Sequence, residues 1–114
     1  MIGLSSNLQY FLCCSTVDMR NGFDGLAGIV RNHLGKDPIS GDIFIFLNKK
    51  LSHIKLLYWD GDGYALFYKR LERGRFSLGT HNGLSKQIKR DELLMLLEGL
   101  SFKETIKKKR FKLA

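Results

Sequence analysis

The tetrapeptide Asp60-Gly61-Asp62-Gly63 constrains the fold more than any other part of the sequence, because apolar runs of strand length flank it on both sides. These runs are Ser52–Trp59 and Tyr64–Lys69, and both are rich in aromatic and aliphatic residues. Asp-Gly between such runs is typical of a tight β-hairpin, whose turn residues take positive φ. We therefore expect a structural turn here, with both glycines required by its geometry.

Pairing of Asp60 with Gly63 determines which hairpin side chains share a face of the sheet. One face then carries the pairs Lys55–Tyr68, Leu57–Leu66 and Trp59–Tyr64. The other face places Ile54, Leu56 and Tyr58 opposite Lys69, Phe67 and Ala65. Because the second face is the more apolar, we expect it to pack against the core.

Apolar periodicity predicts the remaining elements. Leu8–Ser15 and Ile43–Leu47 are apolar runs of strand length, and Arg75–Leu78 is a candidate short strand. Asp91–Glu98 is expected to be a helix that opens on acidic residues and is closed by Gly99. Gly79–Ser85 is expected to be a loop.

A further helix is indicated by apolar residues at helical spacing, namely Phe23, Leu26, Ala27, Val30 and Leu34. Asn21 is expected to cap its start, and Gly35 suits a left-handed residue at its end. Gly25 and Gly28 are tolerable inside this helix if they let it approach a sheet closely.

The fold expected from these elements is a single α+β domain over residues 1–102. It has a mostly antiparallel sheet of about four to five strands with a central hairpin, and about two covering helices. Residues 103–114 form a basic tail, either a flexible arm that binds DNA or a solvated end.

The charge balance indicates a polyanionic partner. Nineteen Lys and Arg residues against eleven Asp and Glu give a net charge of +8 and a pI near 9.7. Such a field concentrates polyanions at the surface, which favours nucleic acid over the alternative of an acidic protein.

No apolar run approaches the roughly 18 residues of a membrane helix, so no membrane partner is expected. Cys13 and Cys14 are adjacent and are expected to be reduced thiols of a cytoplasmic protein.

Three ordered blocks of sequence resemble one protein family. They are Val17–Ala27 (VDMRNGFDGLA), Asp37–Phe46 (DPISGDIFIF) and Lys55–Phe76 (KLLYWDGDGYALFYKRLERGRF). The blocks cover residues 17–76 and resemble the TnpB-type proteins, which the second reading frame of insertion-sequence-66 bacterial transposons encodes. Asn21 and Leu47–Lys50 depart from the pattern, since the family often has basic residues there. The resemblance implies an accessory role in transposition beside a separate, larger transposase, with no established catalytic chemistry.

Basic side chains are the candidate nucleic-acid contacts, because Lys and Arg neutralise phosphates and release counterions. The candidates are Lys49, Lys50, Lys55, Lys69, Arg70, Arg73, Arg75, Lys107, Lys108, Lys109 and Arg110. Aromatic residues interleave with them and are candidates for base stacking, namely Trp59, Tyr64, Tyr68 and Phe76. The alternative is a solvated sheet edge whose aromatic residues pack in the core.

Other side chains support catalysis or metal binding poorly. Asp60 and Asp62 resemble a Mg²⁺ pair, but a phosphoryl-transfer centre needs carboxylates from separate elements. Asp18 and Asp24 are better explained by the start of the first helix, where Asp18 is able to pair with Arg20. The histidines and cysteines lack the spacing of zinc sites. We expect no catalytic residue, metal or cofactor.

The sequence thus predicts a non-catalytic accessory factor in transposition that binds DNA, the transposase of the same element, or both. The DNA would be transposon ends or non-specific duplex. A protein–protein adaptor without DNA contact is the main alternative, and a small metal-dependent nuclease is the least favoured one. The oligomeric state is left open.

Overall fold

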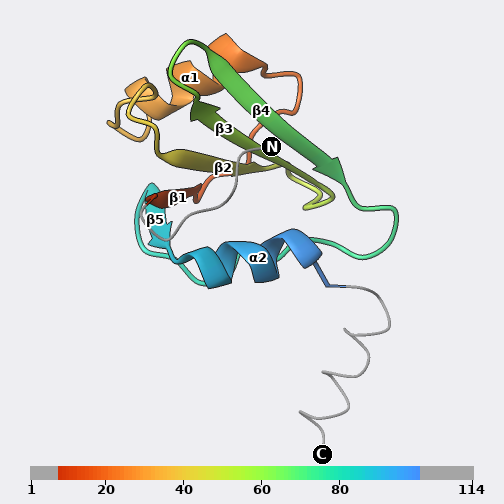
Figure 1. The fold of residues 1–114 in the computed structure, drawn as a ribbon. Helices are drawn as coiled ribbons and strands as arrows, with labels where there is room; N and C mark the ends of the chain where they lie inside the picture. Colours follow the sequence, from red (N-terminus) through yellow and green to blue (C-terminus); the bar gives the residue numbers. More distant parts are fainter. Residues whose placement is uncertain (1–7, 101–114) are drawn as a thin grey trace, which may run out of the picture.

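Five strands form one sheet in the computed structural model, which describes residues 8–100 (Figure 1). The strands are β1 (Tyr10–Cys13), β2 (Ile43–Leu47), β3 (His53–Trp59), β4 (Tyr64–Arg70) and β5 (Ser85–Ile88). Their order across the sheet is β4-β3-β2-β1-β5. The neighbours β1 and β2 are parallel, and the other three pairs are antiparallel. The expectation of an α+β fold with a mostly antiparallel sheet is confirmed.

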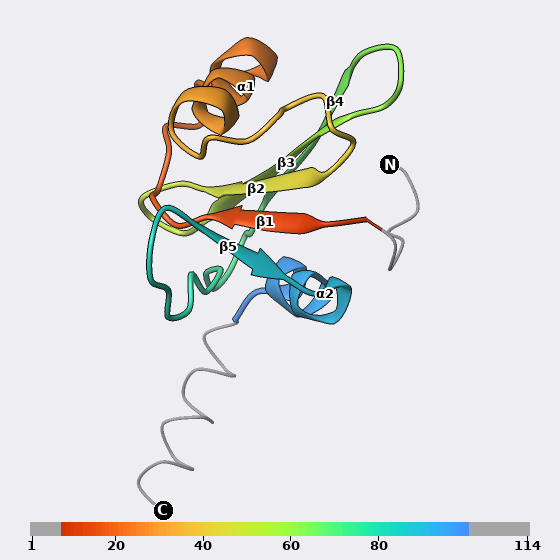
Figure 2. The same ribbon diagram turned by 90° about the vertical axis from the view of Figure 1, so that its left-hand side faces the viewer.

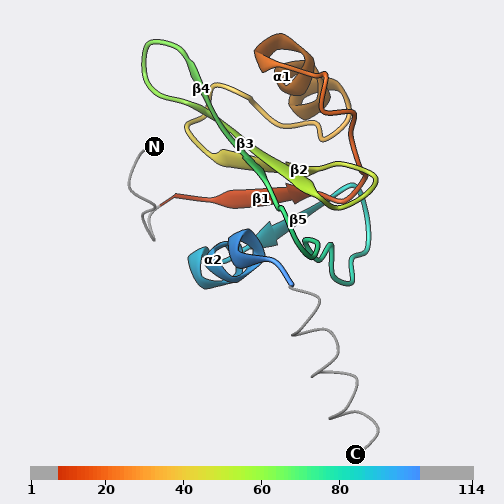
Figure 3. The same ribbon diagram turned by 90° about the vertical axis from the view of Figure 1, so that its right-hand side faces the viewer.

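The two helices cover opposite faces of the sheet (Figure 2, Figure 3). Helix α1 (Phe23–Asn32) packs Leu26, Ala27 and Val30 against inward residues such as Phe44 and Phe46. Helix α2 (Arg90–Glu98) packs Leu93 on the other face, against a cluster that includes Tyr10, Ile43, Ile45 and Leu56. Because both faces are covered, every residue of β2 is buried, which explains its uninterrupted apolar run.

The β3–β4 hairpin has the predicted register. Lys55 pairs with Tyr68, Leu57 with Leu66, and Trp59 with Tyr64. The backbone N–H of Asp60 donates to the carbonyl oxygen of Gly63 at 2.8 Å.

One expectation about this hairpin needs correction, and one is confirmed. Gly61 has a φ of +88°, as the turn requires, whereas Gly63 is not among the residues with positive φ. The face with Ile54, Leu56 and Tyr58 is buried as expected, but Leu57 on the opposite face is buried too. The second layer of core under α1 accounts for that burial.

The start of α1 differs from the prediction. Asn21 does not cap the helix, because its side-chain amide donates to the carbonyl oxygen of Asp18 at 2.9 Å. Phe23 is 48% exposed and lies outside the core. Gly25 is explained by Asn21 and not by the sheet, since a Cβ on Gly25 would lie 2.5 Å from Asn21 Oδ1. Gly28 has open space around it, so close helix–sheet approach explains neither glycine.

Strand β5 was not expected. Residues 79–85 were expected to form a loop, but Ser85 begins a strand that pairs antiparallel with β1. Residues 75–78 do not form a strand, and Arg75 makes only an isolated bridge with Leu100. Helix α2 ends at Gly99, whose φ of 73° confirms the predicted glycine stop. The basic tail at 103–114 lies outside the described residues.

Candidate nucleic-acid interface

Two basic loops lie side by side at one end of the sheet (Figure 1). One is the turn between β2 and β3, and the other follows β4. The backbone N–H groups of Leu71 and Phe76 in the second loop donate to the carbonyl oxygens of Ser52 and Leu51 in the first, at 2.9 and 2.7 Å. The fold therefore brings together five exposed cations, which we call the basic end: Lys49, Lys50, Arg70, Arg73 and Arg75.

The β2–β3 turn is held by the side chain of Asn48. Its Oδ1 accepts the backbone N–H groups of Ser52 and His53 at 2.8 and 2.9 Å. The N–H of Leu51 donates to the Asn48 carbonyl oxygen at 3.0 Å, and Leu51 has a φ of 58°. A left-handed non-glycine residue costs roughly 1–2 kcal/mol, which packing of the Leu51 side chain against the core offsets. The central residues of this rigid turn are Lys49 and Lys50.

Arg20 extends the basic end and was not among the predicted contacts. The segment before α1 runs beside the β2–β3 turn, because the N–H of Val17 donates to the Leu47 carbonyl oxygen at 2.8 Å. Arg20 pairs with Asp18 at 2.7 Å, as the sequence suggested for Asp18. Hydrogen bonds from the Arg20 side chain and backbone lower the pKa of Asp18 to about 2. The sequence signal for Arg20 was its place in the Val17–Ala27 block, since charge alone did not single it out.

Lys55 has a structural role that does not fit phosphate contact. Its side chain is buried, and its Nζ donates to the carbonyl oxygens of Met19 and Asn21 at 2.7 and 2.8 Å. The ammonium also lies 4.6 Å from the centre of the Tyr68 ring. Burial lowers the pKa of Lys55, and the nearby Asp18 carboxylate opposes that shift. Lys55 therefore holds the segment that carries Arg20. Lys55 itself is not part of the candidate interface.

Lys69 is engaged in a similar way. Its Nζ donates to the carbonyl oxygen of Leu97 at 2.7 Å, in the last turn of α2. A cation is favourable at this position, since the C-terminus of a helix carries partial negative charge. Charge alone does not distinguish these two lysines from surface cations, because their carbonyl partners come from distant parts of the chain.

The arginines at the end of β4 and in the loop that follows it are more accessible. Arg70 contacts Glu72 at 2.8 Å, with both side chains well exposed. Exposed pairs of this kind contribute roughly 0–1 kcal/mol, so Glu72 restrains the Arg70 guanidinium only weakly. Arg73 and Arg75 are exposed on the same loop. The basic end is therefore an open cationic surface on a rigid frame.

The aromatic candidates separate into covered and exposed rings. Phe76 is fully buried in the core under α2 and is excluded from base stacking. Trp59 packs edge to face on Tyr64, with ring centres 5.2 Å apart, at the far end of the hairpin. Tyr68 is 51% exposed and lies on β4 near Arg70.

The acidic residues that the sequence offered as metal ligands lie on different elements. Asp60 and Asp62 are exposed at the hairpin turn, and Asp24 lies in the first turn of α1. Within residues 8–100 there is no group of three or more His, Cys, Asp or Glu side chains placed to hold a metal ion. Cys13 and Cys14 are buried free thiols, and burial raises the pKa of each.

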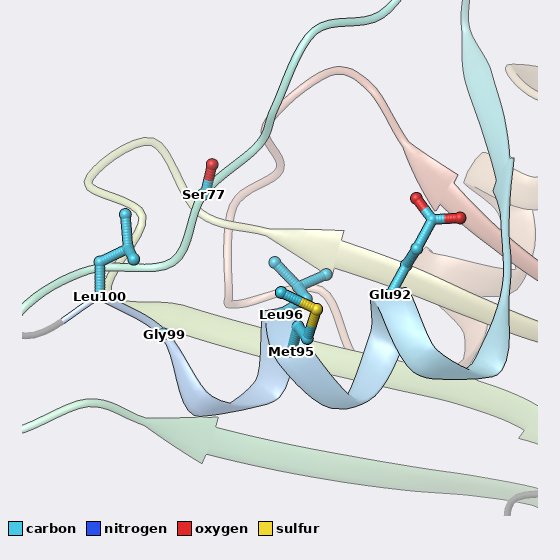
Figure 4. Close-up of a pocket in the computed structure, with 6 residues that line it drawn as sticks. All are labelled: Ser77, Glu92, Met95, Leu96, Gly99 and Leu100. Carbon is cyan, nitrogen blue, oxygen red and sulfur yellow. The ribbon is translucent and has the colours of Figure 1, made fainter. Parts of the chain in front are cut away.

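The pocket beside α2 is mainly apolar (Figure 4). It has a volume of about 270 Å³ and is lined by Ser77, Glu92, Met95, Leu96, Gly99 and Leu100. The Glu92 carboxylate accepts the backbone N–H of Lys89 at 3.1 Å, at the start of the helix. The Ser77 hydroxyl and the Glu92 carboxylate lie at opposite ends of this lining (Figure 4).

Neither helix described between residues 8 and 100 combines the length and the hydropathy needed to cross a membrane.

Comparison with known proteins assigns the chain to a family. The model of the IS66 Orf2-like proteins matches residues 8–107. The chain is 35% identical to the uncharacterized protein y4jC of Sinorhizobium fredii (strain NBRC 101917 / NGR234), over 90% of this chain and 87% of that protein. It is 34% identical to the uncharacterized protein y4hO of the same strain, over 90% of each chain. No solved structure matches significantly. The protein belongs to the IS66 Orf2-like family, and is a transposition-associated accessory protein of that type.

Proposed function

We propose that this protein is a non-catalytic accessory factor that binds DNA through the basic end during transposition of its element. The observation that supports this most is the junction of the two loops, which places five exposed Lys and Arg side chains on one rigid surface. Arg20 adds a sixth cation, and Asp18 and Glu72 are the carboxylates paired nearby. The surplus of positive charge is local and does not merely reflect the net charge of the chain.

The mechanism is electrostatic. Phosphates displace Glu72 from Arg70 and are neutralised by the surrounding lysines and arginines, which releases condensed counterions from the DNA. The logarithm of the binding constant then falls with the logarithm of salt concentration, with a slope of about 0.9 for each phosphate neutralised on duplex DNA. Contacts of this kind position a protein on DNA without reading its sequence.

The test replaces Arg70, Arg73 and Arg75 together by Ala, which we call the arginine triple. Fluorescence anisotropy with duplex DNA of the transposon end measures the affinity at several salt concentrations. We expect the triple to bind more weakly, and its salt slope to fall by about 0.9 for each phosphate that it no longer neutralises.

A charge-matched control removes three cations elsewhere, on α1 and around the opposite edge strand β5. The control variant changes Arg31, Lys86 and Lys89 to Ala. If both triples lose the same affinity, the general charge of the protein drives binding and the basic end has no special role. If neither loses affinity, the assignment of the site is wrong.

A protein–protein adaptor is the second candidate, and the outer face of α2 favours it. Leu94 and Met95 are 38% and 72% exposed there, next to the pocket of Figure 4. A partner protein that packs there would cover these side chains and the adjoining apolar pocket. Co-purification with the transposase from nuclease-treated lysate, lost in Met95→Lys and kept in the arginine triple, would favour this function.

DNA left intact by the protein with Mg²⁺ or Mn²⁺ would count against a nuclease.

A further inference from the structure

Tyr68 is an aromatic ring left open to solvent beside the basic end. It is 51% exposed although it lies in the middle of a sheet strand. An open pocket of about 210 Å³ adjoins it, lined by His53, Tyr68 and Arg70. These three side chains lie on the α1 face of the sheet, since His53 pairs with Arg70 and Tyr68 with Lys55.

The ring is supported from the sheet side. Lys55, directly across the strand pair, places its ammonium 4.6 Å from the ring centre. The His53 ring lies 5.7 Å away at a tilt of 40°. His53 is itself fixed, because its Nδ1 lies 3.1 Å from the Asn48 amide nitrogen and 2.7 Å from the Ser52 hydroxyl. The orientation of that amide is set by the two backbone N–H groups that its oxygen accepts.

The outer side of the ring is available for a ligand. β4 is the edge strand of the sheet, so within residues 8–100 no strand lies beyond it. Lys55, whose ammonium lies over the ring, is on the neighbouring inner strand β3. Arg70 follows Tyr68 by two residues on the same face, a separation of about 7 Å along the strand. A flat group on Tyr68 would have a guanidinium within reach of an attached phosphate.

An exposed aromatic ring beside cations is the combination that binds a nucleobase with its phosphate. Single-stranded nucleic acid is bound by aromatic rings on which bases stack, combined with cations along the backbone. Both features are present here, since Tyr68 offers an exposed ring and Arg70 lies beside it. A basic peptide is disfavoured by Lys55, Arg70 and the adjacent turn lysines.

We propose that Tyr68, with His53 and Arg70, forms a stacking site for an unpaired base of DNA whose phosphate contacts Arg70. The site gives the protein a preference for single-stranded or unpaired DNA over duplex DNA. This inference rests on the proposed function, since it assigns the form of DNA bound at the basic end.

The test compares Tyr68→Leu, which keeps an apolar side chain, with Tyr68→Phe, which keeps a stacking ring. Anisotropy is measured with one oligonucleotide of about 20 nucleotides, single-stranded and as its duplex. We expect Tyr68→Leu to weaken single-strand binding roughly 5- to 140-fold and to leave duplex binding within about twofold. Tyr68→Phe should bind as the natural protein does. Thermal unfolding confirms that each variant is folded.

A second readout reports stacking itself. A single-stranded probe with 2-aminopurine in place of one adenine loses fluorescence when that base stacks on a ring. We expect quenching with the natural protein and Tyr68→Phe, and its loss with Tyr68→Leu at saturating protein.

The outcomes separate this inference from the proposed function. Equal affinity of the natural protein for both DNA forms, with loss of both in the arginine triple, overturns the stacking site and leaves the proposed function standing. The same holds if Tyr68→Leu lowers capture of the transposase and leaves binding to single strands unchanged. No binding to either DNA form overturns both.

Discussion

Replacing Lys55 by Met tests whether a buried ammonium holds the segment before α1. Methionine keeps a straight apolar stem and removes only the charge and its donors. The natural side chain makes two hydrogen bonds from a charged donor, at 2.7 and 2.8 Å, and each such bond contributes about 1.5–3 kcal/mol. The gross loss is therefore about 3–6 kcal/mol.

Two effects reduce that loss. The natural ammonium is disfavoured by burial, as its lowered pKa indicates, and the Met side chain carries no such cost. The two carbonyl groups also belong to half-buried residues, so water reaches them in the variant. We expect a net fall in unfolding free energy of about 2–3 kcal/mol, which corresponds to roughly 10–20 °C in Tm for a domain of this size.

Urea unfolding followed by far-UV circular dichroism measures the change. Lys50→Met is the matched control, since Lys50 is exposed on the β2–β3 turn and its loss should cost less than about 0.5 kcal/mol. If Lys55→Met is no less stable than Lys50→Met, the carbonyl groups do not depend on the ammonium. Lys55 would then return to the set of candidate DNA contacts.

Two further predictions concern the hairpin turn and the loop before α1. Gly61→Ala should lower the free energy of unfolding in urea by about 1–2 kcal/mol, because the φ of Gly61 is +88°. Gly63→Ala in the same turn should lower it by less than about 0.5 kcal/mol. Equal losses in the two variants would contradict the turn geometry. The Asp18 carboxylate should titrate near pH 2 in ¹³C NMR, below its ordinary pKa of 3.8, and Arg20→Met should return it toward 3.8. Because the folded pKa is depressed, this pair stabilises the fold above pH 3.8 and is lost as the pH falls toward 2; a midpoint near 3.8 in the natural protein would show that the pair does not form in solution.

The hairpin was predictable because its signals are local. Turn residues, strand alternation and apolar content all lie within Lys55–Phe76, and together they determine the register. Strand β5 gave no such signal, since its sequence is Ser-Lys-Gln-Ile and only Ile88 is buried. It is a strand because β1 offers an unpaired edge, which is a property of the assembled sheet.

The candidate interface was predictable in composition and not in arrangement. The sequence identified the basic residues around the hairpin, but charge alone does not distinguish an exposed arginine from a buried lysine. Lys55 and Lys69 satisfy carbonyl groups that come from distant parts of the chain. Arg20 joins the surface for the same reason, because Lys55 draws its segment onto the sheet.

The position of β1 between β2 and β5 has a consequence for synthesis of the protein. Tyr10 pairs with Ile43 on one side and with Ile88 on the other. The edge of β1 that pairs with β5 therefore stays unpaired until residues near the end of the described chain have been synthesised. Pairing between such distant residues is slow, because a long loop must close first. Until then a nascent or truncated chain exposes the apolar edge Tyr10–Cys13, which favours aggregation. A chain that ends before Ser85 therefore lacks the strand that covers this edge of β1.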